Sequence, residues 1–190
     1  MNYHNITKDD MLNGDGLRVV LWLSGCSNCC PGCQNPQTWD PNSGLLFDKA
    51  AYEEVVAELE KDYISGITLS GGDPLYPANR EPVTELCKDL KSRFPNKTIW
   101  MYTGYDWYEV KDLPVMQYVD ILVDGKFDEG LKLNSYHWAG STNQRVINVQ
   151  ESLRTGELVI HEESKKKATW KLVSCTSEEL MKMKCPNSEC

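Results

Sequence analysis

The sequence predicts an α/β fold, with a sheet of parallel strands covered by helices. Short apolar segments typical of buried strands alternate with longer segments that carry apolar residues at helical spacing. Strands that follow one another through helices pair in parallel by right-handed crossovers. The chain has 190 residues, of which 41% are hydrophobic, so we expect one domain with a substantial core.

The first half of the chain supplies two strands and two helices. Leu17–Leu23 is an apolar segment and is expected to be the first strand. Residues 48–63 have apolar side chains at helical spacing, and Asp48 is placed to cap that helix. Residues 67–70 are expected to form the second strand, and residues 81–94 a helix that ends before a proline.

The second half continues the alternation. Thr98–Tyr102 is expected to be the third strand, and residues 119–123 the fourth. Between them, residues 106–117 predict a helix that is interrupted near Pro114. Residues 145–149 are a candidate for one more strand.

A loop of cysteines directly follows the first predicted strand. Cys26, Cys30 and Cys33 have the spacing CxxxCxxC. A cubane [4Fe–4S] cluster normally takes four cysteine thiolates, so a loop that offers three leaves one iron without a protein ligand. Such an iron can bind a substrate or cofactor, and the pattern therefore indicates chemistry as well as structure.

Other uses of these cysteines are open at this point. A structural zinc site would require four ligands in closed pairs, and no second CxxC or CxxH pair follows in the middle of the chain. Cys26 and Cys29 form a CxxC that is conceivable as a redox pair, but the following Pro31 and Gly32 favour a loop over a helix start. Disulfides are the simplest alternative. If a cluster is bound, Cys29 is a spare thiol and is expected to be a packing residue.

A second motif, Ser70-Gly71-Gly72-Asp73-Pro74, follows the second predicted strand. Two glycines let the backbone pass close to a ligand, and exposed backbone groups can bind the polar end of that ligand. Alone, this segment would be an ordinary turn. Together with the cysteine loop at this distance, the motif is a much more specific sign of a ligand-binding site than it would be alone.

Together the two motifs resemble those of the radical S-adenosylmethionine (SAM) enzymes. Within that group the chain resembles the activating enzymes of anaerobic ribonucleotide reductase, and the resemblance extends from Met1 to about Ile160. The stretches that carry it are NGDGLR (13–18), CPGCQN (30–35) with Thr38-Trp39, LSGGDPL (69–75), WMYTGY (100–105), VDILVDGKF (119–127) and GSTNQRV (140–146). One departure is Gln34, since the residue after the last cluster cysteine is often Tyr in this family.

The resemblance implies a single-domain partial (β/α) barrel of the radical SAM type, shortened and open, formed by residues 1–163. Working residues in such barrels lie on loops at the carboxyl ends of the strands. The loops after all four predicted strands are therefore expected to meet at one mouth. Residues 164–190 are expected to be a tail of unknown role that contains Cys175, Cys185 and Cys190.

The resemblance also implies ligands for the site residues. Cys26, Cys30 and Cys33 would hold three irons of a [4Fe–4S] cluster, and SAM would chelate the fourth. Residues 71–73 would bind the methionyl amino group, because a carboxylate and backbone carbonyls suit an ammonium ion.

Further contacts to SAM are implied from two other loops. Lys126 would reach the SAM carboxylate with Asp124 nearby, although a surface turn with a salt bridge is the alternative for this pair. Gly32 and Gln34 would border the adenine. Two weaker candidates, equally plausible as residues that cap the backbone, are Ser24 and Thr103.

The implied reaction is reductive cleavage of SAM to methionine and a 5′-deoxyadenosyl radical, which removes a hydrogen atom from the Cα of a glycine on the reductase and leaves a glycyl radical. The cofactor performs the difficult step. The implied partners are anaerobic ribonucleotide reductase and a reducing electron donor such as flavodoxin. No general acid or base is needed, so His4 and His137 need no catalytic role, and His137 is expected to be a packing or surface residue.

Two alternative functions are kept. The chain could activate another glycyl radical enzyme or modify a peptide by the same chemistry. It could also be a metal-binding interaction module without catalytic activity.

Composition restricts the partners and the compartment. The net charge is −8, and no basic stripe is present to neutralise phosphates, so we expect no nucleic-acid partner. No segment approaches the length of a membrane span, and the N-terminus lacks the features of a signal peptide. We therefore expect a cytoplasmic protein, in which a reducing environment keeps eight cysteines as thiols.

Some remaining side chains are expected to be core residues. Cys87 lies within a predicted helix and is expected to be a small buried residue. Tyr102, Tyr105, Trp107 and Tyr108 form an aromatic group near the expected mouth. Most of them are expected to pack in the core, while one or two could meet a partner protein.

Overall fold

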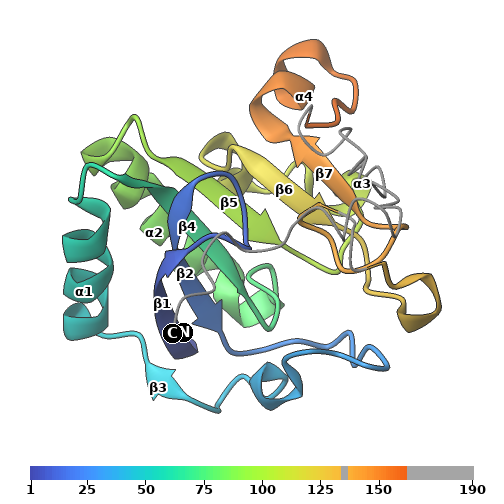
Figure 1. Ribbon diagram of the computed structural model, residues 1–190, viewed down its shortest axis with the longest axis horizontal. Coiled ribbons are helices and arrows are strands. Elements are labelled where there is room, and N and C mark those ends of the chain that lie inside the picture. The colour runs from blue at the N-terminus through green and yellow to red at the C-terminus, as the bar shows by residue number, and fades with distance from the viewer. Residues whose placement is uncertain (134–136, 162–190) are drawn as a thin grey trace, which may run out of the picture.

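The computed structural model describes residues 1–133 and 137–161, and these form one sheet with helices packed against it (Figure 1). The end of the expected domain at residue 163 and the expected tail lie outside the described residues. In the described part of the chain the sheet has seven strands in the order β3-β1-β2-β4-β5-β6-β7. The strands are β1 (Asn2–Asp10), β2 (Leu17–Leu23), β3 (Leu45–Leu46), β4 (Ile64–Gly71), β5 (Thr98–Tyr102), β6 (Ile121–Asp124) and β7 (Arg145–Asn148).

The α/β class and the parallel core of the sheet are confirmed. β2, β4, β5 and β6 are the four predicted strands, and each pairs in parallel with the next. Both edges of the sheet are antiparallel, however: β1 pairs with β2 and β3, and β7 pairs with β6. The sheet is therefore mixed and open.

The sequence did not predict β1. Only Ile6 of its nine residues is buried, because the strand lies near the edge of the sheet and most of its side chains are polar. A short turn joins β1 to β2, and a connection of that length is only compatible with antiparallel pairing. The pairing begins with Tyr3 opposite Leu23 and ends with Asp10 opposite Arg18.

The helices differ from the predictions mainly at their ends. The α-helices are α1 (Lys49–Leu59), α2 (Arg80–Arg93), α3 (Trp107–Val110) and α4 (Val149–Thr155), and the 3-10 helices are η1 (Pro36–Thr38), η2 (Pro77–Asn79), η3 (Pro114–Gln117) and η4 (Glu129–Leu131). Asp48 caps α1 as predicted, because its side chain accepts a hydrogen bond from the backbone N–H of Ala51 at 3.0 Å.

Two predicted helix bounds were wrong for identifiable reasons. The predicted helix 48–63 ends at Leu59, because β4 already begins at Ile64 and the chain must turn between them. The predicted helix 106–117 is divided into α3 and η3. Proline at the start of η3 has no backbone N–H to continue the hydrogen bonds of α3.

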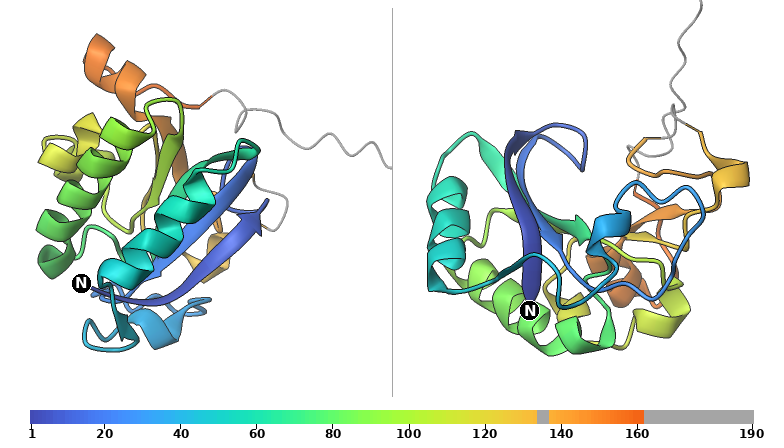
Figure 2. Two further views of the ribbon diagram at one scale, coloured as in Figure 1. Left: turned by 90° about the vertical axis from the view of Figure 1, so that its left-hand side faces the viewer. Right: turned by 90° about the horizontal axis from the view of Figure 1, so that it is seen from below.

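One face of the sheet packs against the helices and forms the main hydrophobic core (Figures 1 and 2). Side chains that alternate along the strands, such as Leu21, Leu69 and Met101, contact apolar residues of α1, α2 and η3. Cys87 of α2 belongs to this core with no exposed surface, which confirms the prediction for this residue.

The opposite face of the sheet is more polar and carries Arg18, Thr68, Trp100 and Tyr102. Arg18 is fully buried here, and its side chain donates hydrogen bonds to Thr68 Oγ1 at 2.8 Å and Thr98 Oγ1 at 2.9 Å. A smaller apolar cluster around Trp100 includes residues of β6 and β7. At the carboxyl ends of the parallel strands, this face borders the cysteine loop.

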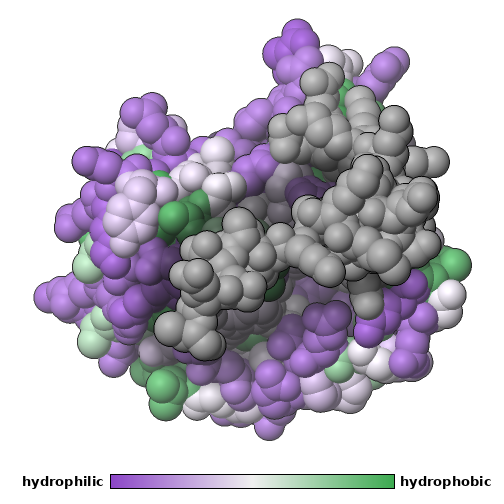
Figure 3. Space-filling view, in the orientation of Figure 1, coloured by the Kyte–Doolittle hydropathy of each residue, from purple (hydrophilic) through white to green (hydrophobic). Residues whose placement is uncertain are grey.

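The face of the molecule in Figure 3 is mainly polar where described residues are visible. In Figure 3 the hydrophilic residues dominate the visible face, and the hydrophobic patches are small and separate. Among the described residues, no helix combines the length and the apolar character that crossing a membrane would require.

Candidate functional site

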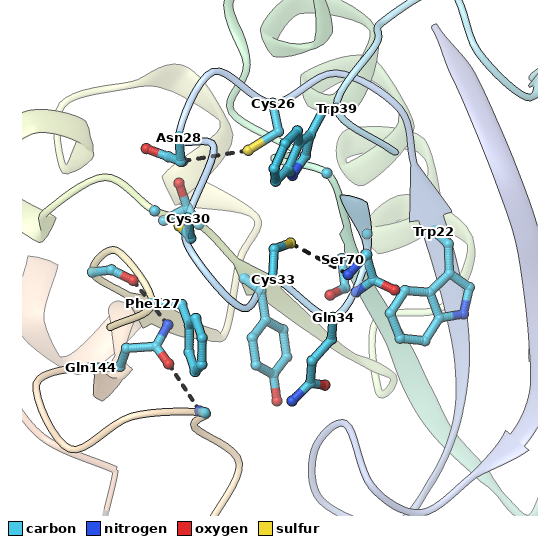
Figure 4. Close-up of a pocket in the computed structure, with 18 of the residues that line it drawn as sticks. Trp22, Cys26, Asn28, Cys30, Cys33, Gln34, Trp39, Ser70, Phe127 and Gln144 are labelled. Atoms are coloured by element: carbon cyan, nitrogen blue, oxygen red, sulfur yellow. Dashed lines mark hydrogen bonds between the residues drawn. The ribbon is translucent and has the colours of Figure 1, made fainter. Parts of the chain in front are cut away.

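A cavity opens at the carboxyl ends of the four parallel strands. It contains about 900 Å³ of empty space, part of which is open to solvent. Its lining includes six residues that the sequence nominated: Cys26, Cys30, Cys33, Gln34, Gly71 and Gly72. Loops after β5 and β6 complete the wall with Thr103, Gly104, Gly125 and Phe127. The expectation that four loops meet at one mouth is met by this arrangement (Figure 4).

The cysteine loop is held by backbone hydrogen bonds near both of its ends. Gly25 N donates to Thr38 O at 2.7 Å, and Cys26 N donates to Trp39 O at 3.0 Å, so the start of the loop is fastened to the segment that follows it. Within the loop, Cys33 N donates to Cys30 O at 3.1 Å. With the loop held in this way, all three cysteines line the same cavity.

Cys29 does not share the position of the other three cysteines of the loop. It is exposed and has a φ of 43°, a left-handed conformation that is uncommon for a residue with a side chain. The expectation that it packs against neighbouring residues is therefore wrong. The turn at Cys29 lets Cys26 and Cys30 both face the cavity while the side chain between them lies in solvent.

Each cavity thiol has polar groups close to its sulfur. Burial raises the pKa of Cys26, whereas N–H groups of Asn28 lower it. Burial also raises the pKa of Cys30, and the charge of Lys126 together with the backbone N–H of Phe127 lowers it. Cys33 Sγ accepts a hydrogen bond from Asn35 N at 3.3 Å. Burial outweighs the nearby donors, so the pKa values of Cys26 and Cys30 stay above the ordinary value of a thiol, and the donors limit that rise. The thiolate is the form that binds metals.

The donor set fits an iron–sulfur cluster. The five cysteines in the described residues are free thiols, and three of them line one cavity. Figure 4 shows Cys26, Cys30 and Cys33 at separate points around that cavity. No group of three or more His, Cys, Asp or Glu side chains in the described ranges is arranged to hold one metal ion. Thiolates placed around a larger space match the thiolate ligation of a cluster of several irons.

The two glycines of the second motif are required by close backbone contacts. Gly71 has a φ of 100°, and a Cβ atom there would lie 2.7 Å from Leu23 O. A Cβ at Gly72 would lie 2.6 Å from Gly25 O. Gly72 N also donates to Leu23 O at 2.8 Å. The turn therefore packs directly against the start of the cysteine loop, and only glycine allows this approach.

Asp73 lies behind the cavity wall instead of lining it. It is 2% exposed, and its carboxylate accepts hydrogen bonds from Thr103 Oγ1 at 2.9 Å, Gly104 N at 3.0 Å and Leu75 N at 2.9 Å. Burial raises the pKa of this carboxyl, and these hydrogen bonds oppose that rise. The side chain thus ties the Gly-Gly turn to the loop after β5. Thr103 serves this network, so the structure favours the backbone-supporting role considered for it.

Comparison with known proteins identifies the family. A protein-family model described as a 4Fe-4S single cluster domain matches residues 12–147. The chain is 46% identical over 146 residues to the anaerobic ribonucleoside-triphosphate reductase-activating protein of Enterobacteria phage T4, with 77% of this chain and 93% of the relative covered. The chain belongs to the family of anaerobic ribonucleoside-triphosphate reductase-activating proteins.

Bacterial members of the family show similar agreement. The chain is 43% identical over 154 residues to the activating protein of Escherichia coli (strain K12), with 79% of this chain and 100% of the relative covered. For the protein of the same name from Vibrio cholerae the identity is 40% over 148 residues, with 76% and 96% covered. The resemblance to the activating enzymes of anaerobic ribonucleotide reductase is thereby confirmed.

Besides Asp73, three residues that the sequence of this family member nominated do not line the cavity, and they are Asp124, Lys126 and Gly32. Asp124 is fully buried and forms an ion pair with Arg145, and it also accepts a hydrogen bond from Trp107 N at 2.8 Å. Lys126 is exposed on a neighbouring surface depression that also includes Glu129. The salt bridge considered for Asp124 and Lys126 is thus made by Asp124 with Arg145, inside the protein.

Gly32 also lies outside the cavity wall. A Cβ atom there would lie 2.6 Å from the carboxyl carbon of Glu129, so this glycine makes room for a residue of η4. Ser24, a weaker candidate, is buried and donates a hydrogen bond to Ser43 O at 2.8 Å. Both residues support the loops that surround the site.

Sequence reasoning missed several lining residues. They share positions on the polar face of the strands or on the loops around them, and they are Asn13, Trp22, Asn28 and Gln144. The alternation of β2 could have found Trp22, because every second side chain of a strand faces the same way. Gln144 lies within a stretch that carried the family resemblance, and it joins two loops by bonds to Gly140 N and Gly125 O, both at 2.9 Å.

The aromatic group expected at the mouth is spread over different environments. Tyr102 lines the cavity, whereas Trp107 is 3% exposed in the main core. Tyr108 is exposed, and Tyr105 packs at the edge of the core with Arg80 over its ring. His137 is exposed, and its ring contacts that of Trp138 edge-on, which agrees with a surface position for this histidine.

Proposed function

We propose that this chain is a radical SAM activating enzyme that generates the glycyl radical of anaerobic ribonucleotide reductase. The observation that carries this proposal is the shared cavity of three free thiols and the Gly71-Gly72 turn at the carboxyl ends of parallel strands. Membership of the reductase-activating family and the match to a 4Fe-4S domain support the same function.

The three thiols have a defined role in this proposal. Cys26, Cys30 and Cys33 would each bind one iron of a [4Fe–4S] cluster, and the fourth iron would be left for SAM. When bound, the reduced cluster and SAM supply the reductive cleavage of SAM and the abstraction of a hydrogen atom from a glycine Cα. The protein supplies position and shields the reaction from water.

The remaining site residues would position and enclose SAM. Backbone groups of Gly71 and Gly72 line the cavity and would bind the methionyl end, while Asp73 would hold this turn in place from behind. Gln34 lines the same cavity and would border the adenine. Tyr102 and Trp22 supply apolar surface on the side of the sheet, which would limit access of water.

Lys126 and Asp124 would act from outside the cavity. Burial raises the pKa of Cys30, and the charge of Lys126 opposes that rise, so this lysine would favour the ionised ligand. Asp124 would fix the loop that carries Gly125 and Lys126 through its bond to Arg145. Neither role requires direct contact with SAM.

The proposal extends to the fold type, partners and compartment. The parallel strands with helices on one face would form the shortened, open barrel of the radical SAM type. The partners would be anaerobic ribonucleotide reductase and a reducing donor such as flavodoxin. The reaction would take place in the cytoplasm, where free thiols persist.

Anaerobic reconstitution tests the proposed chemistry. Protein loaded with iron and sulfide, then reduced with dithionite in the presence of SAM, is expected to release 5′-deoxyadenosine and methionine. Both products are measured by liquid chromatography with mass spectrometry. Cys30→Ala, which removes one iron ligand, is expected to form neither product. A wild-type protein that binds cluster and SAM but forms no 5′-deoxyadenosine would be a metal-binding module instead.

The identity of the partner requires a second measurement. Addition of anaerobic ribonucleotide reductase to the reduced mixture is expected to give the electron paramagnetic resonance doublet of a glycyl radical. The same assay with another glycyl radical enzyme is the matched control and should give no signal. A signal with that enzyme and none with the reductase would assign the activase to a different partner.

A further inference from the structure

The side chain of Asn28 links the cysteine loop to the rest of the site. Its amide nitrogen lies 3.6 Å from Cys26 Sγ, within hydrogen-bond distance for a sulfur acceptor, and 3.2 Å from Asp73 Oδ2. An amide NH₂ group carries two hydrogens, so both contacts can be made at the same time. Asn28 therefore connects a sulfur of the proposed cluster to a buried carboxylate.

The carboxylate of Asp73 determines which way the amide of Asn28 faces. Asp73 Oδ2 accepts hydrogen bonds from Asn28 Nδ2 at 3.2 Å and from Gly104 N at 3.0 Å, so the NH₂ side of the amide points toward the carboxyl group. Asp73 is held in place by donors from its own turn and from the loop after β5, including Gly104 N at 3.0 Å. Because the NH₂ group is directed by Asp73, its second hydrogen is aimed at Cys26 Sγ.

The space for this amide depends on a glycine. A Cβ atom at Gly104 would lie 2.2 Å from Asn28 Nδ2 and 2.7 Å from Asn28 Cγ. The amide of Asn28 is thus packed against the backbone of the loop after β5. Residues from the loops after β2, β4 and β5 meet at this one contact, which fixes the distance between Asn28 and Cys26.

We propose that Asn28 is a positioning residue that holds Cys26 and donates an N–H···S hydrogen bond to it when the cluster is bound, which raises the reduction potential of the cluster. Hydrogen bonds to cluster sulfurs stabilise the reduced, more negative state, and they are one of the factors that set this potential. The proposal rests on the proposed function in one respect, that Cys26 is a cluster ligand. It adds a residue that the CxxxCxxC spacing does not specify.

Redox titration of the reconstituted protein without SAM tests the role of Asn28. Asn28→Leu replaces the amide by a side chain of similar size that has no donor. At the midpoint potential of the wild type, where half of the clusters are reduced, the variant is expected to show at least a threefold lower ratio of reduced to oxidised cluster. That change corresponds to a midpoint lower by about 28 mV, from 59 mV per tenfold for one electron. The reduced cluster is quantified by its electron paramagnetic resonance signal.

A neighbouring substitution is the matched control. Ser27 is exposed and lies in the same loop, so Ser27→Ala is expected to leave the midpoint unchanged. If Asn28 were only a structural residue, Asn28→Leu would lower the thermal stability and keep the wild-type midpoint. An unchanged midpoint in fully loaded Asn28→Leu overturns the proposal.

A variant that loads poorly is also informative. If Asn28→Leu binds less than four irons, Asn28→Ala, which only removes atoms, is titrated in its place. The same threefold lower ratio of reduced to oxidised cluster is then expected for Asn28→Ala. If both variants keep the circular dichroism and melting temperature of the wild-type apoprotein but do not load, the positioning of Cys26 is supported. Failure of the wild type to bind a cluster at all would instead reject the proposed function, so the two failures are distinguishable.

Discussion

Asp124 is fully buried at the end of β6, and its charge is balanced inside the protein. Arg145 Nε donates to Asp124 Oδ1 at 3.0 Å, and Arg145 Nη2 also contacts Asp106 Oδ2 at 2.7 Å. Trp107 N donates to the second oxygen of Asp124. These bonds join the end of β6 to the starts of β7 and α3. A buried carboxylate with this set of donors is a structural element of the loop that leads to Lys126.

Asp124→Asn is expected to lower the free energy of unfolding by about 2–3 kcal/mol. Removal of one partner of a buried ion pair usually costs about 3–5 kcal/mol, and Arg145 is one-third exposed here, which reduces the effect. Urea denaturation followed by circular dichroism measures the change. Glu151→Gln, which removes the exposed pair with Arg154, is the control and should give no measurable loss. Equal stability of the two variants would contradict the structural role.

Cys87 shows the effect of burial on a thiol that has no partner in the site. It has no exposed surface, and burial raises its pKa from 9.0 to about 12. A pKa that is raised in the folded state means that the thiol ionises more readily after unfolding. Its contribution to stability is therefore full below pH 9 and is lost as the pH rises toward 12.

Alkylation by iodoacetamide at pH 9 is expected to modify Cys87 at least a hundredfold more slowly in the native protein than in urea. About half of the thiols are ionised in the unfolded chain at this pH, against roughly one in a thousand in the folded protein, and only the thiolate reacts. Mass spectrometry of the tryptic peptide gives both rates. A native rate within tenfold of the unfolded rate would show that Cys87 is not buried in solution.

At the scale of the elements, the junction of β2 and β4 determines the geometry of the cavity. The two strands are in register from Arg18 to Leu23, and Leu23 lies opposite Gly71 at the end of the pair. Beyond this point the chain leaves the sheet on both sides, into the cysteine loop and the Gly-Gly turn. The backbones of the two exits touch, since Asp73 N donates to Gly25 O at 2.8 Å.

Gly71→Ala is expected to lower the free energy of unfolding by about 3 kcal/mol or more. The substitution forces a side chain into a φ of 100° and brings its Cβ within 2.7 Å of Leu23 O, a backbone atom that cannot move aside. Gly156→Ala is the matched control, because its φ is 77° but no atom lies within 4 Å of the added Cβ. It should cost only about 1 kcal/mol. Chemical denaturation of both variants measures the difference, and equal losses would exclude the clash.

The elements also show which parts of the fold the sequence could predict. The bounds of β2 and β5 were predicted correctly, because continuous apolar residues mark strands that are buried on both faces. β1 was missed because an edge strand with polar side chains has no such pattern. The antiparallel pairing of β7 could not be derived either, since direction depends on the path of a long connection.

The site was predictable to the extent that its residues are close in sequence. CxxxCxxC and Gly-Gly are local patterns, and both line the cavity. The roles of Asp73 and Asp124 depend on Thr103 and Arg145, which lie far along the chain. No rule of sequence spacing predicts such partners. The sequence therefore pointed to SAM as the partner of Asp73 and Asp124, whereas both carboxylates form their hydrogen bonds with groups of the protein.

At the scale of the whole molecule, Arg18 holds together the strands on which the site is built. It is fully buried beneath the polar face of the sheet, and it bonds to β4 through Thr68 and Ile67 O and to β5 through Thr98. Burial lowers its pKa from 12.5 to about 10, so the side chain is still charged at neutral pH. Trp100 lies against the guanidinium, with its ring centroid 5.3 Å away. One residue of β2 thus joins three of the four parallel strands whose carboxyl ends form the cavity.

Arg18→Lys is expected to destabilise the whole protein by about 2–4 kcal/mol, although the charge is kept. The guanidinium bonds to five oxygens, from Thr68, Ile67, Asp15 and both polar groups of Thr98, whereas an ammonium group has three hydrogens and cannot span three strands. At least two buried acceptors would lose their donors, at about 1–2 kcal/mol each. Thermal and urea unfolding measure the loss, with exposed Arg93→Lys as the control that should remain close to the wild type. If Arg18→Lys matched that control, charge alone would account for Arg18, and the hydrogen bonds across β2, β4 and β5 would not be what holds this face of the sheet together.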